Sequence, residues 1–190
     1  PETPDYRPSW APLSATPLDW LPAVENRGEG IFLELDPKRL ALWSAKFKTR
    51  ADGINEQWLR DWEERHKERK KRGEKVPPPA REVTPKLLVL HSLSHALIRQ
   101  LSLDCGYSAA SLRERLYVDG DCAGLLIYTA APDSDGTLGG LSRQGTAARM
   151  VGVLEGSLAS QRWCSSDPLC AMGAHSFSEK ASGAACHSCL

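Results

Sequence analysis

Four of the six cysteines lie at the C-terminal end of the chain, in W-C-S-S-D-P-L-C, fifteen further residues and C-H-S-C. Cys186 and Cys189 have the C-x2-C spacing that places two thiolates on one side of a tight turn, as tetrahedral zinc sites require. Cys164 and Cys170 form a looser pair with turn residues between them. The linker between the pairs has few large apolar residues, whereas a four-cysteine zinc site contributes folding free energy of about 10 kcal/mol. We therefore predict a zinc site with ligands Cys164, Cys170, Cys186 and Cys189.

Other arrangements of these cysteines remain open. The four thiols could form two disulfides, but that requires an oxidising compartment, of which the sequence gives no sign. They could also be unligated buried thiols, or His175 or His187 could replace one cysteine as a ligand. Four thiolates leave no open coordination position, so the predicted site is structural. Cys105 and Cys122 are expected to be dispensable for metal binding.

Two further groups of residues have types that could do chemistry. His91 and His95 are four residues apart on a predicted helix and therefore face the same way. The zinc-hydrolase motif H-E-x-x-H needs a Glu after the first His, and Ser92 stands there, so we expect hydrogen-bonded core histidines. Asp133 and Asp135 lie in P-D-S-D-G-T-L-G-G-L, which lacks the final Glu of a calcium loop and is expected to form a turn.

Composition and missing motifs exclude several classes of protein. The 190-residue chain has no net charge, so no overall basic field indicates nucleic acid. It has no G-x4-G-K-[ST] phosphate loop, no H-x-K pair, no G-x-S-x-G and no apolar run long enough for a membrane helix. No signal peptide is recognisable. We expect a cytoplasmic protein without catalytic activity of its own, and a chain that is a piece of a longer polypeptide.

The first 83 residues are expected to form an arm, a strand, two helices and a linker. Residues 1–29 contain six prolines with Trp10 and Trp20 among them, which predicts an extended arm with aromatic anchors for protein contacts. Residues 30–83 predict a strand at 30–35, a brief helix that begins at Asp36 and Pro37, a second helix over 54–72, and a linker.

Residues 84–163 are expected to form the core. Thr84 and Pro85 begin a mainly apolar helix that ends at Gly106, and Ser108 is expected to cap a shorter one. Residues 124–130 form the clearest strand, apolar throughout and therefore expected to be covered on both faces. A last helix begins near Thr146 and carries an apolar stripe of Ala147, Val151, Leu154 and Leu158. The pattern predicts an α/β fold, a small sheet covered by helices, with a zinc lobe at 164–190.

A run of charged residues follows Trp62 in the second predicted helix. We interpret it as a solvated helix that projects from the body, since such runs are commonly exposed faces. Its cationic end, Arg69, Lys70, Lys71 and Arg72, is the candidate DNA contact.

Four segments occur in a characteristic order over residues 84–190: L-L-V-L-H-S-L-S-H-A-L-I-R-Q-L-S-L-D-C-G-Y-S, P-D-S-D-G-T-L-G-G-L, R-W-C-S-S-D-P-L-C and A-A-C-H-S-C-L. In these motifs the chain resembles the MrfA-type helicase-associated zinc-binding (MZB) domain. That family is found at the C-terminus of MrfA-like DNA-repair helicases and in DrmB, a component of the DISARM antiphage system, and the first two motifs look closer to DrmB. The resemblance assigns zinc to the same four cysteines. Residues before 84 match only loosely, around R-G-E-G-I-F-L-E-L.

The resemblance implies a non-catalytic zinc-binding subunit that associates with a helicase subunit (DrmA-like) and supports DNA binding in antiphage defence, with no membrane involved. One alternative is the C-terminal zinc-binding domain of an MrfA-like DNA-repair helicase. Another, from a different class, is a metal-dependent hydrolase that uses His91 and His95.

Overall fold

Three antiparallel strands form the only sheet among the residues that the computed structural model describes, which are 19–20, 23, 28–76, 78–79, 82–129 and 140–163. Strand β3 (Gly124–Thr129) lies in the middle, between β1 (Gly30–Glu34) and β2 (Leu112–Tyr117). Ile31 pairs with Ile127, and Ile127 pairs with Glu114 on the other side. The strands predicted at 30–35 and 124–130 are confirmed.

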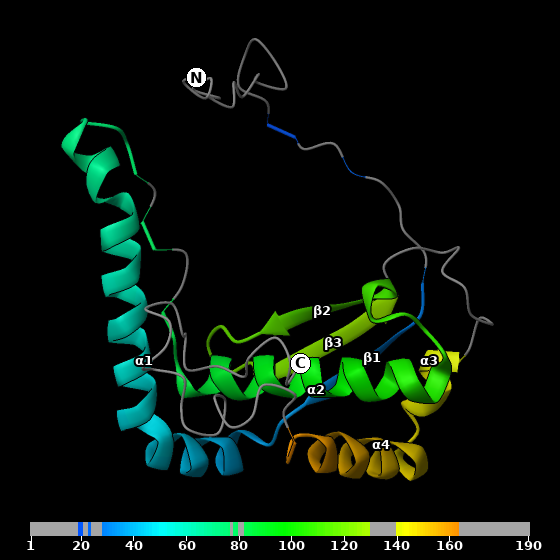
Figure 1. Cartoon of the computed structure of the whole chain (residues 1–190). Coiled ribbons are helices and arrows are strands. Elements are labelled where there is room, and N and C mark those ends of the chain that lie inside the picture. Colours follow the sequence, from blue (N-terminus) through cyan, green and yellow to red (C-terminus); the bar gives the residue numbers. More distant parts are fainter. Residues whose placement is uncertain are drawn as a thin grey trace.

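Helix α2 (Pro85–Cys105) runs along one face of this sheet, and α4 (Ala147–Ser160) packs against α2 (Figure 1). The predicted helix ends are confirmed: the Thr84 side chain accepts a hydrogen bond from Leu87 N at 3.2 Å, and Gly106 ends the helix at φ 74°. A left-handed residue at this position favours glycine because it has no Cβ. The centre of the core consists of fully buried side chains from the helices and the middle strand, namely Leu90, Leu97, Leu101, Leu125, Ile127 and Leu141.

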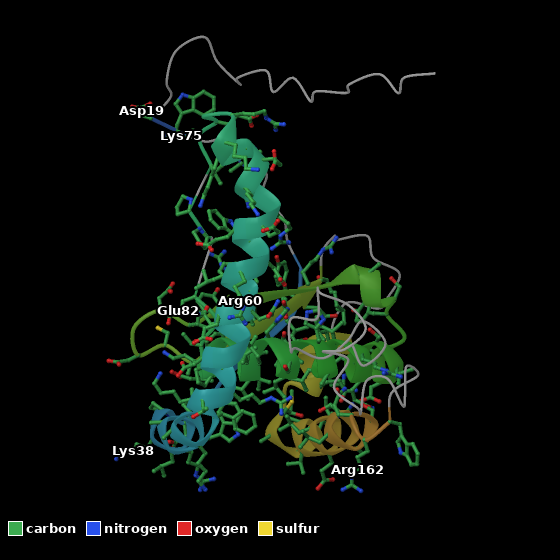
Figure 2. The ribbon with its side chains drawn as sticks, turned by 60° about the vertical axis from the view of Figure 1, so that its left-hand side comes forward. Asp19, Lys38, Arg60, Lys75, Glu82 and Arg162 are labelled. Carbon is green, nitrogen blue, oxygen red and sulfur yellow. The ribbon has the colours of Figure 1, made fainter. Side chains whose placement is uncertain are left out.

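Helix α1 (Pro37–Lys71) is one continuous element of 35 residues, so the prediction of two helices is wrong. Asp36 caps it as predicted, since its Oδ1 accepts from Lys38 N and Arg39 N, both at 2.9 Å. No proline interrupts this span, and Gly53 costs only about 1 kcal/mol relative to alanine. The later turns stand away from the core, in agreement with the predicted projecting helix (Figures 1 and 2). None of the described helices is both long enough and apolar enough to cross a membrane.

The short helix predicted after Ser108 is wrong. A single 3-10 turn, Ala109–Ser111, leads into β2, and the sequence L-R-E-R-L-Y has the two-residue period of a strand. Leu112 and Leu116 pack on the core, while Arg113 and Arg115 are exposed.

Two burial predictions also need correction. In α4 the buried positions are Met150, Val153 and Ser157. Of the predicted stripe, Leu154 does pack against the core, but Val151 is 56% and Leu158 63% exposed, so the stripe is only partly correct. In β3 only alternate residues face the helices, and Leu126 and Tyr128 on the other face are half-buried. Antiparallel strands permit this one-sided cover, which the parallel α/β pattern does not.

Glu29 links the start of β1 to the short helix α3 (Gly140–Gln144). Its carboxylate accepts hydrogen bonds from Tyr107 Oη at 2.5 Å, Leu141 N at 3.1 Å and Ser142 N at 2.9 Å. Burial alone would raise the pKa of Glu29, but the hydrogen bonds from Ser142, Tyr107 and Leu141 outweigh it and lower the pKa to about 2. The same contact raises the pKa of Tyr107 to about 12. Glu29 therefore holds three segments together as an ionised group.

Candidate metal centre

The four cysteines of the predicted zinc site lie outside the described residues, as do Asp133 and Asp135. Of the two tryptophans of the arm, Trp10 also lies outside, and Trp20 is 59% exposed. The zinc ligands therefore stay a prediction. The described part of the chain contains a separate group of possible metal ligands.

His91 and His95 lie side by side on α2, and their Nε2 atoms are 2.9 Å apart. Their rings meet edge to face, with centroids 4.6 Å apart. The two histidines are hydrogen-bonded to each other, as expected, but they are not core residues, since their side chains are 42% and 32% exposed. The helix turns them away from Leu90 and Leu97, which fill the core, and toward the edge of the sheet.

A third residue, Glu114 of β2, completes the cluster. Its Oε1 lies 3.4 Å from Nε2 of His91 and 3.4 Å from Nε2 of His95. Its other oxygen, Oε2, accepts a hydrogen bond from the hydroxyl of Ser94, which is fully buried on α2. Ser94 Oγ also lies 2.8 Å from the carbonyl oxygen of His91, but one hydroxyl proton serves only one acceptor at a time.

The electrostatics of the cluster centre on Glu114, whose carboxylate is largely screened from water. Burial raises the pKa of Glu114, and the positive charge that His91 can carry opposes this rise. A bound cation would favour the ionised carboxylate in the same way. Two imidazole nitrogens and one carboxylate oxygen are also the donor set of many zinc and iron sites.

Sequence reasoning missed Glu114 because it placed residues 109–115 in a helix. The signal was present in the alternation of L-R-E-R-L-Y: a strand that buries Leu112 and Leu116 must turn Glu114 toward the same side. A carboxylate on the core-facing side of a strand needs a partner. The histidines on the neighbouring helix supply it.

The cationic end of α1 does not belong to this cluster, and its residues are exposed. Arg69 and Arg72 both pair with Glu74, at 2.9 and 2.8 Å, and the ammonium of Lys70 lies 4.8 Å from the centroid of the Trp62 ring. These contacts are open to solvent and contribute little to stability. The fourth cation, Lys71, pairs with Glu68 at 2.8 Å.

The two remaining cysteines are free thiols. Cys122 is exposed, and Cys105 is partly buried beside Gly140, with Sγ 3.6 Å from its carbonyl oxygen. Burial raises the pKa of the Cys105 thiol, and the charges of Asp104 and Glu29 add to the rise. A thiol with a raised pKa holds its proton more firmly and is a poorer nucleophile than an ordinary cysteine.

Comparison with known proteins defines the class. The family model of the MrfA Zn-binding domain (MZB) matches residues 93–190, and the chain belongs to this family. The match includes His95, Glu114 and all four C-terminal cysteines. The chain is also 33% identical over 179 residues to the DISARM protein DrmB of Bacillus paralicheniformis (strain ATCC 9945a / NCIMB 11709 / CD-2).

That alignment includes 90% of this chain but only 29% of the relative. The chain thus spans less than a third of the length of the curated relative that it matches. Its resemblance to the MZB family, and to DrmB in particular, is confirmed. The chain is consequently similar to a DISARM component and itself contains a zinc-binding domain of the MZB family.

Proposed function

We propose that this chain is part of a non-catalytic, zinc-binding subunit of a DISARM-type antiphage system, which associates with a helicase subunit and supports DNA binding. The observation that carries the proposal is the similarity to DrmB along nearly the whole chain. A second candidate is the zinc-binding domain of an MrfA-like helicase, which the family assignment supports equally.

Zinc is held in this proposal by Cys164, Cys170, Cys186 and Cys189. Metal analysis of the reduced whole chain, with and without Cys186→Ser, tests the ligand set. We expect the variant to lose the thiolate-bound zinc, while Cys122→Ser, a control on an exposed thiol, keeps it. Zinc that is unaffected by Cys186→Ser, or mass evidence for two disulfides in the native protein, would refute this ligand set.

Helicase association is tested by co-purification with a helicase subunit of a DISARM-type system. We expect the complex to form with the unchanged chain and to weaken in Trp20→Ala, because exposed aromatic side chains are frequent anchors of interfaces. Cys186→Ser should abolish it by unfolding the zinc lobe. A helicase that binds the Cys186→Ser variant as well as the unchanged chain contradicts the proposal.

DNA binding is tested through the cations at the end of α1. Reversal of Lys70 and Lys71 to Glu should lower the affinity of the complex for duplex DNA and leave helicase binding intact. The log-salt slope should fall by about 0.9 for each phosphate that the variant no longer neutralises. Reversal of Lys38 and Lys46, two exposed lysines near the other end of the same helix, is the matched control. Equal effects of the two reversals would show that overall charge is responsible, and not this cluster.

A further inference from the structure

The side chains of His91, His95 and Glu114 converge from two different elements, although they are separated by up to 23 positions in the sequence. We propose that these three residues bind a divalent transition-metal ion, with Zn²⁺ as the ion that fits best, at a second site that is independent of the C-terminal cysteines. This proposal does not rest on the proposed function.

The distances agree with simultaneous coordination. The three donor atoms form a triangle with sides of 2.9, 3.4 and 3.4 Å. Donors at zinc's usual bond length, in a tetrahedral arrangement, are about 3.3 Å apart. The point equidistant from all three atoms lies about 1.9 Å from each, slightly inside the bond length of about 2.0–2.1 Å for nitrogen and oxygen on zinc. An ion just off the plane of the triangle therefore reaches all three donors without any movement of the backbone.

The surroundings hold the ligands in this orientation. Ser94 is fully buried on α2 and binds Oε2 of Glu114, which leaves Oε1 directed at the histidines. Such a hydrogen bond to the second oxygen of a ligating carboxylate is typical of protein metal sites. Because Glu114 pairs with Ile127 of the middle strand, its backbone is fixed as well. The site thus stands on two rigid elements.

The donor set selects the class of ion. Calcium and magnesium take oxygen ligands almost exclusively, so two imidazoles disfavour both. Two histidines and one carboxylate suit Zn²⁺ and the neighbouring divalent ions, including Fe²⁺. The histidines are partly exposed, so water can reach the remaining coordination positions. The ion would connect α2 to β2, the strand at the edge of the sheet.

The first test is calorimetric titration of Zn²⁺ into the reduced whole chain as purified, after its metal content has been measured. We expect one additional binding event with one ion per chain. It should disappear in the double variant His91→Ala/His95→Ala and weaken at least tenfold in Glu114→Gln, which keeps the size of the side chain. His66→Ala removes a histidine of α1 and is the matched control. If the additional event is missing, or persists in the double variant, the proposal is wrong and the cluster is a hydrogen-bonded pair of histidines.

A Co²⁺ titration separates this site from the cysteine site. Thiolate ligands give Co²⁺ an intense charge-transfer absorption, whereas nitrogen and oxygen ligands give only weak d–d bands. We expect Cys186→Ser to remove the charge-transfer absorption and to keep the weak bands that depend on His91 and His95. The loss of both signals in Cys186→Ser, while circular dichroism shows intact helices, would contradict two independent sites. Failure of the histidine-dependent signal alone leaves the proposed function untouched.

Discussion

Replacement of Glu29 by Gln should destabilise the protein in a pH-dependent manner. The carboxylate accepts hydrogen bonds from Tyr107, Leu141 and Ser142, and these lower its pKa from 4.5 to about 2. Glutamine has the same size but carries no charge, and only one of its two terminal atoms accepts hydrogen bonds. The substitution therefore tests the charge of Glu29 with little change in packing.

The magnitude follows from the pKa. A fall from 4.5 to about 2 corresponds to at most about 3.4 kcal/mol, at 1.36 kcal/mol for each pKa unit. The carboxylate is partly open to solvent, which screens the interaction, so we expect a decrease in stability of about 1–2 kcal/mol at pH 7. Because the folded-state pKa is lowered, this contribution is complete above the unfolded-state pKa of 4.5 and disappears as the pH falls toward 2.

Urea unfolding of both proteins at several pH values between 7 and 3 measures this difference. The two free energies of unfolding should differ most at neutral pH and should converge as the pH falls below 4.5. Glu34→Gln, at the exposed end of the same strand, is the control and should change stability by no more than about 0.5 kcal/mol. A difference that is independent of pH would refute the reasoning, because it would show a packing effect.

Two other substitutions test the core and the start of the sheet. Gly28→Ala should destabilise the protein by about 1–3 kcal/mol, because the new Cβ would lie 2.4 Å from Thr129 Oγ1. Thermal unfolding measures the loss of stability. Leu97→Ala should lower the free energy of unfolding by about 2–5 kcal/mol, since Leu97 of α2 is fully buried in the core. Urea unfolding measures this loss. The nearby Leu103→Ala is its control, because Leu103 is 74% exposed and should tolerate truncation. If Leu97→Ala and Leu103→Ala lower the free energy of unfolding equally, Leu97 does not belong to the core.

The sequence predicted correctly those helix ends that are determined by capping residues close by in the chain. Asp36 and Thr84, each followed by proline, mark helix starts, and Gly106 marks an end, because capping depends on a few neighbouring residues. The strand at 124–129 was equally clear, since its apolar run is too short for a helix and is rich in residues that favour strands.

The elements that sequence reasoning missed depend on distant partners. Leu112 to Tyr117 is a strand because β3 supplies its hydrogen bonds, and the residues themselves fit a helix almost as well. Which face of α4 is exposed depends on the side that α2 covers. The sequence of α4 alone does not reveal that side. The metal cluster was missed for the same reason: His91 and His95 were found from their spacing, but Glu114 reaches them only once β2 is placed.

The strand order β1-β3-β2 also has a consequence for how the chain folds. Strands β2 and β3 are joined by six residues, whereas β1 pairs with β3 across about 90 residues. Closing the longer loop costs about 2.4 kcal/mol more in chain entropy, so the β2–β3 hairpin should form first and β1 should add to it late. During synthesis β1 leaves the ribosome long before its partner exists. Until β3 is complete, Ile31 has no neighbour to cover it, and any truncated product that ends before residue 124 exposes it to water.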